Sequence, residues 1–386
     1  MKLIYLDNAA TTKCLSGAAE AVAHCLIQEY GNPSSLHFMG LKAEKTLHTA
    51  RDCVARLLGT EPEGIIFTSG GTEANILAIR GALGARPGRI LVSPIEHPSV
   101  REVFLALAKE GWQVQWLPLD EEGLVDLDAL AQALTQPVQM VSVMAVNNEL
   151  GLIQPLPEIG ALIRRLQPQT LFHTDAVQGP GKTPYLLGQT GADLISISAH
   201  KFHGPKGIGA LYVSRGDLLK PLFLGGGQQG NLRSGTENVP GAAGMGEAAR
   251  QFIEHGPAWY QHIAQLNQKL SEGIIALGGV ILSSQKTCAP HILGAYLPGY
   301  RGEIILQALS AKGICITTGS ACSGKKGKGS HLAEALNLPE EARLGQLRFS
   351  FSHFNTPGEV DETLAVLRET LTELAFVRGR GSRNVR

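Results

Sequence analysis

The chain has 386 residues, of which 44% are hydrophobic and 18% charged, a composition typical of a globular protein and not of a disordered one. Its 34 lysines and arginines balance 34 aspartates and glutamates, so no net charge attracts it to nucleic acid or to an anionic membrane. No apolar run is long enough to span a bilayer, and Asp7 interrupts the N-terminal apolar stretch before a signal sequence could form. We therefore expect a cytoplasmic protein that binds neither membranes nor nucleic acid.

Short apolar segments alternate with helical patterns between residues 60 and 215. The apolar segments are hydrophobic on both faces, which is typical of interior strands in a largely parallel sheet covered by helices. Helical patterns lie between them, as at residues 73–83 and 156–166. This rhythm predicts an α/β sandwich built from crossover connections. The expected strands are residues 64–68, 89–93, 140–146, 170–174, 193–198 and 209–213.

The pattern changes after the glycine-rich segment 225–230. Long amphipathic segments at residues 259–277 and 302–312 favour a smaller α+β domain. The last helix has a marked start, because Thr356 followed by Glu359 predicts a capping box. Its buried face is predicted by a single apolar stripe, which consists of Val360, Leu364, Leu367, Leu371 and Leu374.

The six cysteines form no C-x-x-C pair and have no metal-ligand spacing, so the sequence predicts no metal site. In a reducing cytoplasm they should be thiols, and most should pack as small hydrophobic residues. Only Cys322 has neighbours that suggest another role. The cysteines are Cys14, Cys25, Cys53, Cys288, Cys315 and Cys322.

A glycine-containing turn at residues 67–75 follows an expected strand and opens an expected helix. Glycines such as Gly71 let the backbone approach a ligand, and free amides at a helix start favour an anion such as phosphate. Thr72 adds a hydroxyl donor. The segment is neither a dinucleotide fingerprint nor a Walker loop, and an ordinary strand-to-helix turn is the alternative.

Hydroxyl, imidazole and amine groups end the expected strand at residues 193–198 and continue through Ser198, His200 and Lys201. An amine at the end of a buried strand can form a Schiff base with pyridoxal phosphate (PLP) when its surroundings lower its pKa. Two alternatives stay open: Lys201 could extend to solvent from a strand end, and Lys206 could be the reactive amine.

Three further polar residues follow strand ends. Asp175 suits the carboxylate that keeps the pyridine nitrogen of PLP protonated, and Gln178 suits a hydrogen bond to the phenolic oxygen of the ring. His97 could stack on the ring. Taken alone, an aspartate at a strand end such as Asp175 is usually part of a turn, and an isolated histidine such as His97 usually has a structural role. Their shared place at carboxyl ends of strands, where open α/β sheets bind ligands, favours one PLP site.

These motifs resemble the cysteine desulfurases of the class V aminotransferase superfamily, the NifS/IscS-like proteins. The resemblance covers nearly the whole chain. The departures are Asn75-Ile76 in place of a double asparagine and a more basic segment at Lys325, Lys326 and Lys328. The matching segments are residues 5–12, 31–35 with His37, 68–75, 147–149, 173–178, 198–201, 233–238, 319–322 and 347–350.

The resemblance implies the fold type I of PLP-dependent transferases. It comprises a large domain with a mostly parallel, mixed seven-stranded sheet between helices, and a smaller α+β domain. We expect the large PLP-binding domain over residues 14–256. The small domain should combine residues 1–13 with 257–386 and carry the loop of the catalytic cysteine. The family forms homodimers with shared sites.

The resemblance also implies a role for each matching residue. Lys201 would hold PLP as a Schiff base, with His97 stacked on the ring and Asp175 at its nitrogen. Gln178 and Asn148 would contact the ring and its substituents. The phosphate would be held by Gly71, Thr72, Ser198 and His200, and by Thr236 from the neighbouring subunit.

For the substrate, the resemblance implies that Arg348, with Asn32, binds the carboxylate of L-cysteine, a task that suits a bidentate guanidinium. Cys322 would take the sulfur as a persulfide, leaving L-alanine. A sulfur-acceptor protein, a scaffold or carrier for iron–sulfur cluster, thio-cofactor or tRNA synthesis, would then take the sulfur. The three lysines after Cys322 would favour its thiolate, or would simply form a solvated basic loop.

Other members of the superfamily are the nearest alternatives: a selenocysteine lyase, a cystine lyase or a class V aminotransferase. Cys322 argues against a simple aminotransferase, which needs no nucleophile there. An alternative of a different class is a non-catalytic scaffold partner that keeps the fold. The presence of Lys201, Asp175 and Cys322 argues against it.

Overall fold

The computed structural model describes residues 3–284, 286–319 and 331–375. The chain divides into two compact units. Unit 1 consists of Met1–Thr11, Asn147–Ile153 and Pro257–Arg386, and unit 2 consists of Thr12–Val146 and Gln154–Gly256. The domain division expected from the sequence stays a prediction. The units differ from it chiefly in the short segment Asn147–Ile153, which is assigned to unit 1.

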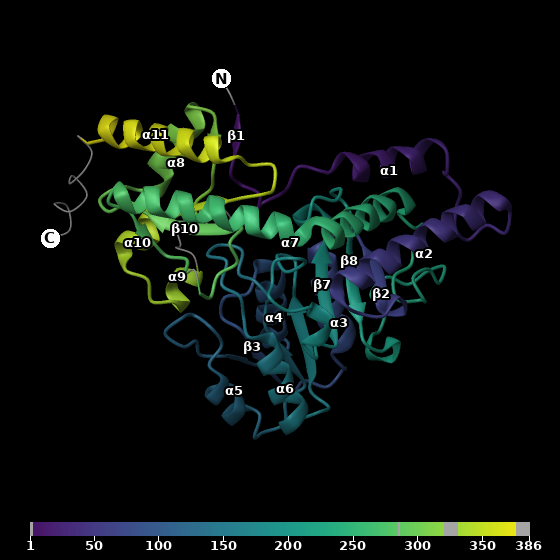
Figure 1. Ribbon diagram of the computed structural model, residues 1–386. Helices are drawn as coiled ribbons and strands as arrows, with labels where there is room; N and C mark the ends of the chain where they lie inside the picture. Colours follow the sequence, from purple (N-terminus) through teal and green to yellow (C-terminus); the bar gives the residue numbers. More distant parts are fainter. Residues whose placement is uncertain (1–2, 285, 320–330, 376–386) are drawn as a thin grey trace. The chain divides into compact units, whose positions relative to one another are not determined.

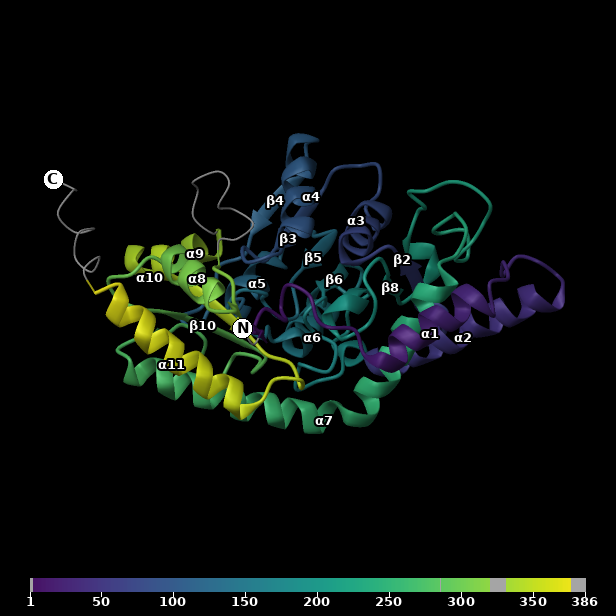
Figure 2. The ribbon, with the colours of Figure 1, turned by 90° about the horizontal axis from the view of Figure 1, so that it is seen from above.

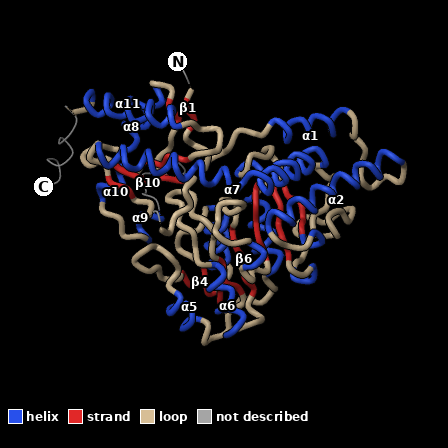
Figure 3. The backbone as a smooth tube through the Cα atoms, in the orientation of Figure 1, coloured by secondary structure: helices blue, strands red, loops and turns tan. Residues whose placement is uncertain are grey.

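Unit 2 is built on a seven-stranded sheet in the order β2-β8-β7-β6-β5-β3-β4. β8 runs antiparallel to both of its neighbours, and the other strands are parallel to one another. The predicted mostly parallel, mixed seven-stranded sheet is therefore confirmed. Figure 3 shows these strands in red among blue helices. Their bounds are β2 Ile65–Thr68, β3 Arg89–Val92, β4 Gln113–Trp116, β5 Met140–Ser142, β6 Leu171–Asp175, β7 Leu194–Ser198 and β8 Gly209–Val213.

The interior strands form because their side chains are apolar on both faces, so helices can cover the sheet on two sides. Every residue of the interior strands β5 and β7 is buried, and so is every residue of β2, although β2 lies at an edge of the sheet. β4 is different, because its residues alternate between exposed and half-buried at the edge of the sheet. This edge strand was missing from the predicted strands, and the predicted strand at residues 140–146 ends in the structure at Ser142.

The helices of unit 2 begin at clear signals. The side chain of Asp126 caps α5 by accepting from two amides of its first turn, and α2 ends at Gly59 in the left-handed conformation. Figure 2 shows α3 and α4 on one side of the sheet and α6 on the other. The bounds are α1 Ser16–Ile27, α2 Phe38–Leu58, α3 Gly71–Ala82, α4 Pro98–Lys109, α5 Leu127–Ala133 and α6 Leu156–Leu166, with three-residue 3-10 turns η1 Pro62–Gly64, η2 Leu187–Gln189, η3 Ala199–Lys201 and η4 Gly216–Leu218.

A 38-residue helix, α7 Val239–Ala276, contains residues of both units: it belongs to unit 2 up to Gly256 and to unit 1 from Pro257 on (α7 is labelled in Figure 1). Pro257 lies inside this helix and is the first helix residue that belongs to unit 1. Proline has no amide hydrogen, so the helical ladder loses one hydrogen bond there. The sequence predicted only the part after Pro257, because glycine, alanine and proline weaken the amphipathic pattern of the first half.

Unit 1 contains two small sheets. β1 pairs in parallel with β11, Ile4 opposite Ile314, and β10 lies between β12 and β9 in an antiparallel sheet. Their buried side chains form one core with α8 and α11. No helix in the described ranges is long and apolar enough to cross a membrane. The bounds are β1 Ile4–Tyr5, β9 Val280–Ile281, β10 Ile292–Tyr296, β11 Ile314–Cys315, β12 Leu347–Ser350, α8 Gly302–Ala311, α9 His331–Ala335, α10 Glu340–Gly345 and α11 Pro357–Glu373.

The predicted capping box at the start of α11 is confirmed. Thr356 Oγ1 accepts from the Glu359 amide at 3.3 Å, and a Glu359 side-chain oxygen accepts from the Thr356 amide at 3.0 Å. Two amides of the helix start are thereby satisfied reciprocally.

Replacing Thr356 by alanine should lower the free energy of unfolding by about 1 kcal/mol, because the Glu359 amide loses its side-chain partner. Urea denaturation followed by circular dichroism measures this change. Thr372→Ala, on the exposed face of the same helix, is the control and should cost clearly less. An equal loss in the two variants would contradict the capping argument.

Candidate active site

The strands that precede the predicted site residues end at one edge of the sheet. β3, β5, β6 and β7 are parallel, and β2 has the same direction because β8 is antiparallel to both β2 and β7. The segments around Gly71, His97, Asp175 and Lys201 therefore leave the sheet at the same edge. This is the edge where open α/β sheets place their ligands.

Asp175 ends β6 and is almost completely buried, with 4% of its surface exposed. Its Oδ2 accepts from Asn75 Nδ2 at 2.8 Å, and its Oδ1 accepts from the Val177 amide at 2.9 Å. Asn75 lies in α3, one turn after the glycine-containing start, and also donates to Ser99 Oγ at 2.9 Å. These two donors hold both oxygens of the buried carboxylate in place. Asp175 thus presents a fixed negative charge at the sheet edge.

His97 precedes α4 and caps it, because its Nδ1 accepts from the Ser99 amide at 3.1 Å. Burial lowers the pKa of His97, the charge of Asp175 raises it, and the charge of Lys201 lowers it, so that the net result lies below the usual range. The imidazole is therefore neutral at neutral pH. Since both charges act on this ring, His97, Asp175 and Lys201 belong to one cluster.

The start of α3 lies against the end of β7. A Cβ added at Gly71 would come within 2.6 Å of Val177 Cγ2 and 3.5 Å of Ser198 Cβ, so this close approach requires glycine. No side chain caps the helix at Gly70. Thr72 is exposed in the first turn. A helix start that lacks a side-chain cap and has a serine hydroxyl beside it suits a phosphate group.

Lys201 and His200 lie in η3, directly after β7. Burial lowers the pKa of His200 to about 4, and the charges of Lys201, Lys206 and Lys182 act in the same direction. The Nζ of Lys182 donates to the main-chain oxygen of Lys201 at 2.9 Å. A cluster of amines around a neutral imidazole therefore completes this edge of unit 2.

The loop before α7 is hydrogen-bonded to the start of α3 and to β2. Arg233 Nε donates to Glu73 Oε1 at 2.8 Å, and the Phe67 amide donates to Gln229 Oε1 at 2.8 Å. Thr236 lies in this loop and is exposed. Gln178, by contrast, is buried close to Asp175 in the sequence, with 3% of its surface exposed.

Arg348 lies in unit 1, on β12, with 7% of its surface exposed. Its Nη2 donates to Asp7 Oδ1 at 2.8 Å and its Nη1 to the main-chain oxygen of Asn148 at 2.7 Å. Its Nε is buried and has no hydrogen-bond partner among the described residues. Asn148 thus contributes a main-chain oxygen here, in addition to the side-chain role predicted for it.

One predicted residue, Asn32, lies apart from these clusters. Asn32 is exposed in the connection between α1 and α2, where its side-chain oxygen accepts from the Ser34 amide at 3.0 Å. In Figures 1 and 2 this connection projects from unit 2. Cys322 and the basic segment Lys325, Lys326 and Lys328 lie outside the described residues.

Three residues of the site were not singled out by the sequence analysis. Asn75 holds Asp175, Lys182 holds the Lys201 carbonyl, and Glu96 directly precedes His97. Glu96 is completely buried, and burial followed by the charge of Asp175 raises the pKa of its carboxyl well above the usual range. The sequence signal was their proximity to predicted motifs: Asn75 lies in the turn at residues 67–75, Glu96 is next to His97, and Lys182 is four residues after Gln178.

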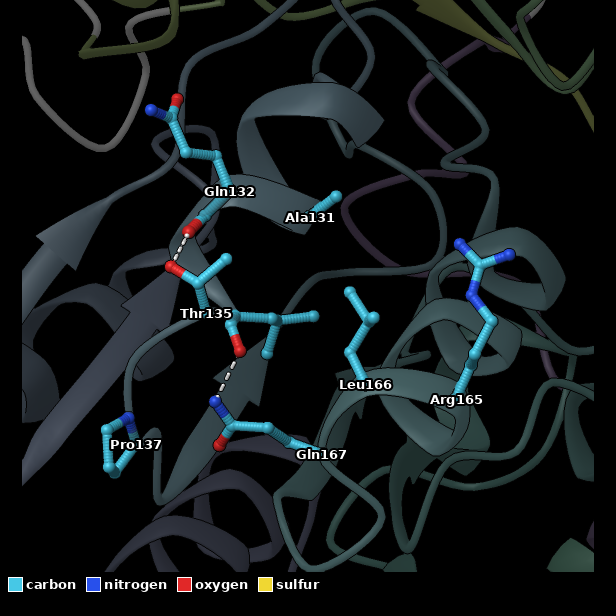
Figure 4. A pocket seen from close by; sticks show the side chains of 8 residues that line it. Ala131, Gln132, Thr135, Pro137, Arg165, Leu166 and Gln167 are labelled. Atoms are coloured by element: carbon cyan, nitrogen blue, oxygen red, sulfur yellow. Dashed lines mark hydrogen bonds between the residues drawn. The ribbon is translucent and has the colours of Figure 1, made fainter.

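A hollow of about 660 Å³ lies at the opposite edge of the sheet, before the amino ends of β5 and β6. Figure 4 shows side chains of α5 and α6 around it. Gln167 donates there to the main-chain oxygen of Leu134 at 2.5 Å, and Thr135 to that of Gln132 at 2.7 Å. Its polar groups therefore serve the local fold, and it lacks the convergent charges found around Asp175.

The model of the class V aminotransferase family matches residues 4–363. A cysteine desulfurase of Cereibacter sphaeroides is 40% identical over 394 residues, covering 100% of this chain and 100% of that protein. The cysteine desulfurase IscS of Dictyoglomus turgidum is 38% identical over 379 residues, covering 97% and 96%. A solved NifS-like protein matches with a TM-score of 0.91 at 35% identity, covering 97% of this chain and 100% of that one.

The match extends over both units and includes the whole cluster at the sheet edge. The resemblance and the fold type expected from the sequence are thereby confirmed. The chain belongs to the cysteine desulfurases of the class V aminotransferase family, enzymes that depend on pyridoxal phosphate.

Proposed function

We propose that this cysteine desulfurase binds PLP through Lys201 and Asp175 and transfers the sulfur of L-cysteine to Cys322. The main support is the environment of Asp175: a buried carboxylate with two donors, in the same cluster as the Lys201 amine and the neutral His97 ring. A protonated ring nitrogen needs such a fixed negative charge. The phosphate end of the cofactor also has a suitable partner, because the start of α3 lies beside Ser198 and suits a phosphate group.

Each residue proposed to contact the cofactor then has a defined task. Lys201 Nζ holds the cofactor and, once released, takes the proton from the substrate Cα. His97 lies against the ring and, being neutral, places no positive charge there. When bound, PLP supplies the electron sink for the reaction. The remaining contacts follow the family pattern, with the phosphate at Gly71, Thr72, Ser198 and His200 and the ring at Gln178 and Asn148.

Arg348 is proposed to bind the substrate carboxylate. Its guanidinium is oriented by Asp7 and by the Asn148 carbonyl, while the buried Nε has no partner among the described residues. A guanidinium fixed in this way binds a carboxylate without losing further side-chain freedom. Asn32 is proposed to assist.

The proposed sulfur transfer to Cys322 needs no external oxidant, because every bond and electron pair is accounted for by the enzyme and the substrate. The Cys322 thiolate attacks the sulfur of the substrate, so that an S–S bond forms while the substrate Cβ–S bond breaks. The electron pair of the broken bond stays with the substrate carbon, which is protonated and leaves as L-alanine. The product on the protein is a persulfide, whose outer sulfur is then passed to a scaffold or carrier protein for iron–sulfur cluster, thio-cofactor or tRNA synthesis.

The enzyme is proposed to act in the cytoplasm. The five described cysteines are free thiols, as expected in a reducing compartment. In unit 2, exposed apolar side chains gather on the α1–α2 connection and on the loop before α7, and among them Leu36 is 94% and Leu224 85% exposed. Such side chains are typical of a surface covered by another subunit. They support a homodimer in which Thr236 reaches the partner's cofactor phosphate.

Charged residues at both positions should separate the dimer. We expect the double variant Leu36→Glu, Leu224→Glu to sediment as a monomer and to bind PLP more weakly, because the phosphate loses Thr236 of the partner. Sedimentation velocity and cofactor absorbance measure the two effects. Leu166→Glu, at an exposed leucine of the hollow in Figure 4, is the control and should stay dimeric. A dimeric double variant would contradict this interface.

The function is tested by incubating the purified protein with L-cysteine, cystine and selenocysteine in parallel. Alanine should form from L-cysteine, and mass spectrometry should find one added sulfur on the peptide of Cys322. Faster alanine formation from selenocysteine or cystine would favour the corresponding lyase. A colourless protein that forms no alanine from any of the three would favour a non-catalytic partner.

A further inference from the structure

A chain of hydrogen bonds runs from the carboxylate of Asp175 to the ring of His97. Asn75 Nδ2 donates to Asp175 Oδ2 at 2.8 Å and to Ser99 Oγ at 2.9 Å. Ser99 Oγ lies in turn 2.8 Å from His97 Nδ1. The chain joins β6, α3 and α4 within unit 2. It therefore connects the two side chains that the proposed function places at the ring nitrogen of PLP and against the ring.

The direction of each bond in this chain follows from the groups that form it. A carboxylate oxygen accepts hydrogen bonds, so the amide nitrogen of Asn75 is the atom that faces Asp175. Asn75 is completely buried, and its Oδ1 has no hydrogen-bond partner among the described residues. Its nitrogen donates to Asp175 and to Ser99. Ser99 Oγ thus accepts from Asn75, which leaves the hydroxyl proton of Ser99 to be donated to His97 Nδ1.

The main chain of Ser99 makes a second bond to the same nitrogen. Pro98 is the first residue of α4, so the Ser99 amide is one of the amides at the helix start that have no partner within the helix. It donates to His97 Nδ1 at 3.1 Å. A main-chain amide can only donate, so Nδ1 is the ring nitrogen without a proton. The proton of the neutral imidazole is therefore on Nε2.

These bonds act together with the charges around His97. Burial lowers the pKa of His97, Asp175 on β6 raises it, and Lys201 in η3 lowers it. Protonation of the ring would place a hydrogen on Nδ1 and displace both bonds from Ser99, so the two bonds favour the neutral ring. Because α4 occupies Nδ1, Nε2 is the ring nitrogen left for the cofactor or the substrate.

We propose that Ser99 is a positioning residue for His97: its amide and its hydroxyl occupy Nδ1, keep the ring proton on Nε2 and connect the ring through Asn75 to Asp175. The proposal rests on the function assigned to His97 above and extends it by naming what orients that ring.

Two variants isolate the hydroxyl of Ser99. Ser99→Ala removes the hydroxyl and keeps the main-chain amide, whereas Ser99→Thr keeps both donors. Ser214→Ala removes the hydroxyl of an exposed serine elsewhere in unit 2 and is the control.

The measurement is nitrogen NMR of the protein freed of cofactor and labelled with ¹⁵N in its histidine rings. The His97→Gln variant identifies the signals of His97, whose shifts show which ring nitrogen carries the proton. A titration between pH 4.5 and pH 8.5 gives the midpoint of the ring. We expect the wild-type proton on Nε2. Ser99→Ala should raise the midpoint by about 0.5–1 pKa unit, because one hydrogen bond to the neutral form is lost. Ser99→Thr and Ser214→Ala should keep the wild-type midpoint.

The loaded enzyme provides a second readout. Ser99→Ala should lower kcat for alanine formation about fivefold and leave KM for L-cysteine within about twofold, because the ring loses orientation while the substrate contacts remain. Ser99→Thr should restore the wild-type kcat.

A purely structural role for Ser99 predicts a different result. Ser99→Ala would then lose stability as a helix-start variant while the His97 midpoint stayed at the wild-type value, and this would overturn the proposal. A wild-type proton on Nδ1 would overturn it as well, and that spectrum needs no variant to fold. If the spectra are as expected but no alanine forms from L-cysteine, the proposed function is refuted and the positioning of the His97 ring by Ser99 stands.

Discussion

Replacing Cys322 by alanine is expected to lower sulfide release from L-cysteine by at least about 10³-fold while leaving PLP absorbance unchanged. Without the thiolate, no nucleophile accepts the substrate sulfur, so the Cβ–S bond has no route to break. No cofactor contact is assigned to Cys322, so the cofactor contacts are not altered by this change. Sulfide is measured with a reductant present, and the visible spectrum is recorded on the same sample.

Cys288→Ala is the matched control. Burial raises the pKa of the Cys288 thiol to about 11, so this cysteine is a thiol and not a thiolate at neutral pH. Its replacement should leave sulfide release within about twofold of the wild type, because a neutral thiol is a poor nucleophile. Full activity in the Cys322 variant, or loss of activity in the Cys288 variant, would show that the sulfur acceptor was assigned to the wrong cysteine.

Replacing Asp175 by asparagine is expected to lower kcat by about 10²–10³-fold, the range found when one fixed electrostatic partner of a reacting group is removed. The asparagine side chain has one oxygen and can accept from only one of the two donors, Asn75 Nδ2 or the Val177 amide, and the negative charge that they hold would be lost. The ring nitrogen of PLP would then lose its proton more readily, and the electron sink would weaken. Single-turnover kinetics of alanine formation measures the effect, with PLP content determined separately.

Asp193→Asn is a control on the neighbouring strand. Asp193 lies before β7 at the opposite edge of the sheet, where it is bonded to Arg164 and to the Phe172 amide. We expect this variant to lose stability in urea while keeping the wild-type kcat, since no cofactor contact is assigned to it. If the two variants lost kcat equally, the loss in Asp175→Asn would come from a change in the fold and not from the loss of a cofactor contact.

The sheet and the polar groups at its edge could be predicted from the sequence because each left a local signal. Strands buried on both faces are continuous apolar runs, and Asp175, Ser198 and Lys201 follow such runs directly. The capping box of α11 was equally local, since Thr356 and Glu359 are three residues apart. Where signal and structure lay within a few residues of each other, the strands and the capping box were predicted correctly.

The remaining features depend on contacts that no local pattern contains. Arg348 bonds to Asp7 across 341 positions of the sequence, and Asn75 reaches Asp175 across 100. Lys182 acts on a main-chain oxygen, which carries no residue-specific signal. β4 was missed because, as an exposed edge strand of four residues, it has no apolar run.

The pairing of β1 with β11 has a consequence for the newly made protein. Ile4 and Tyr5 leave the ribosome before their partners Ile314 and Cys315, which are made some 310 residues later. At about 5–20 residues per second, the N-terminal segment waits roughly 15–60 s for its place in the small sheet. During translation it is an unpaired, apolar strand, and a chaperone that shields the emerging N-terminus should therefore raise the yield of native enzyme.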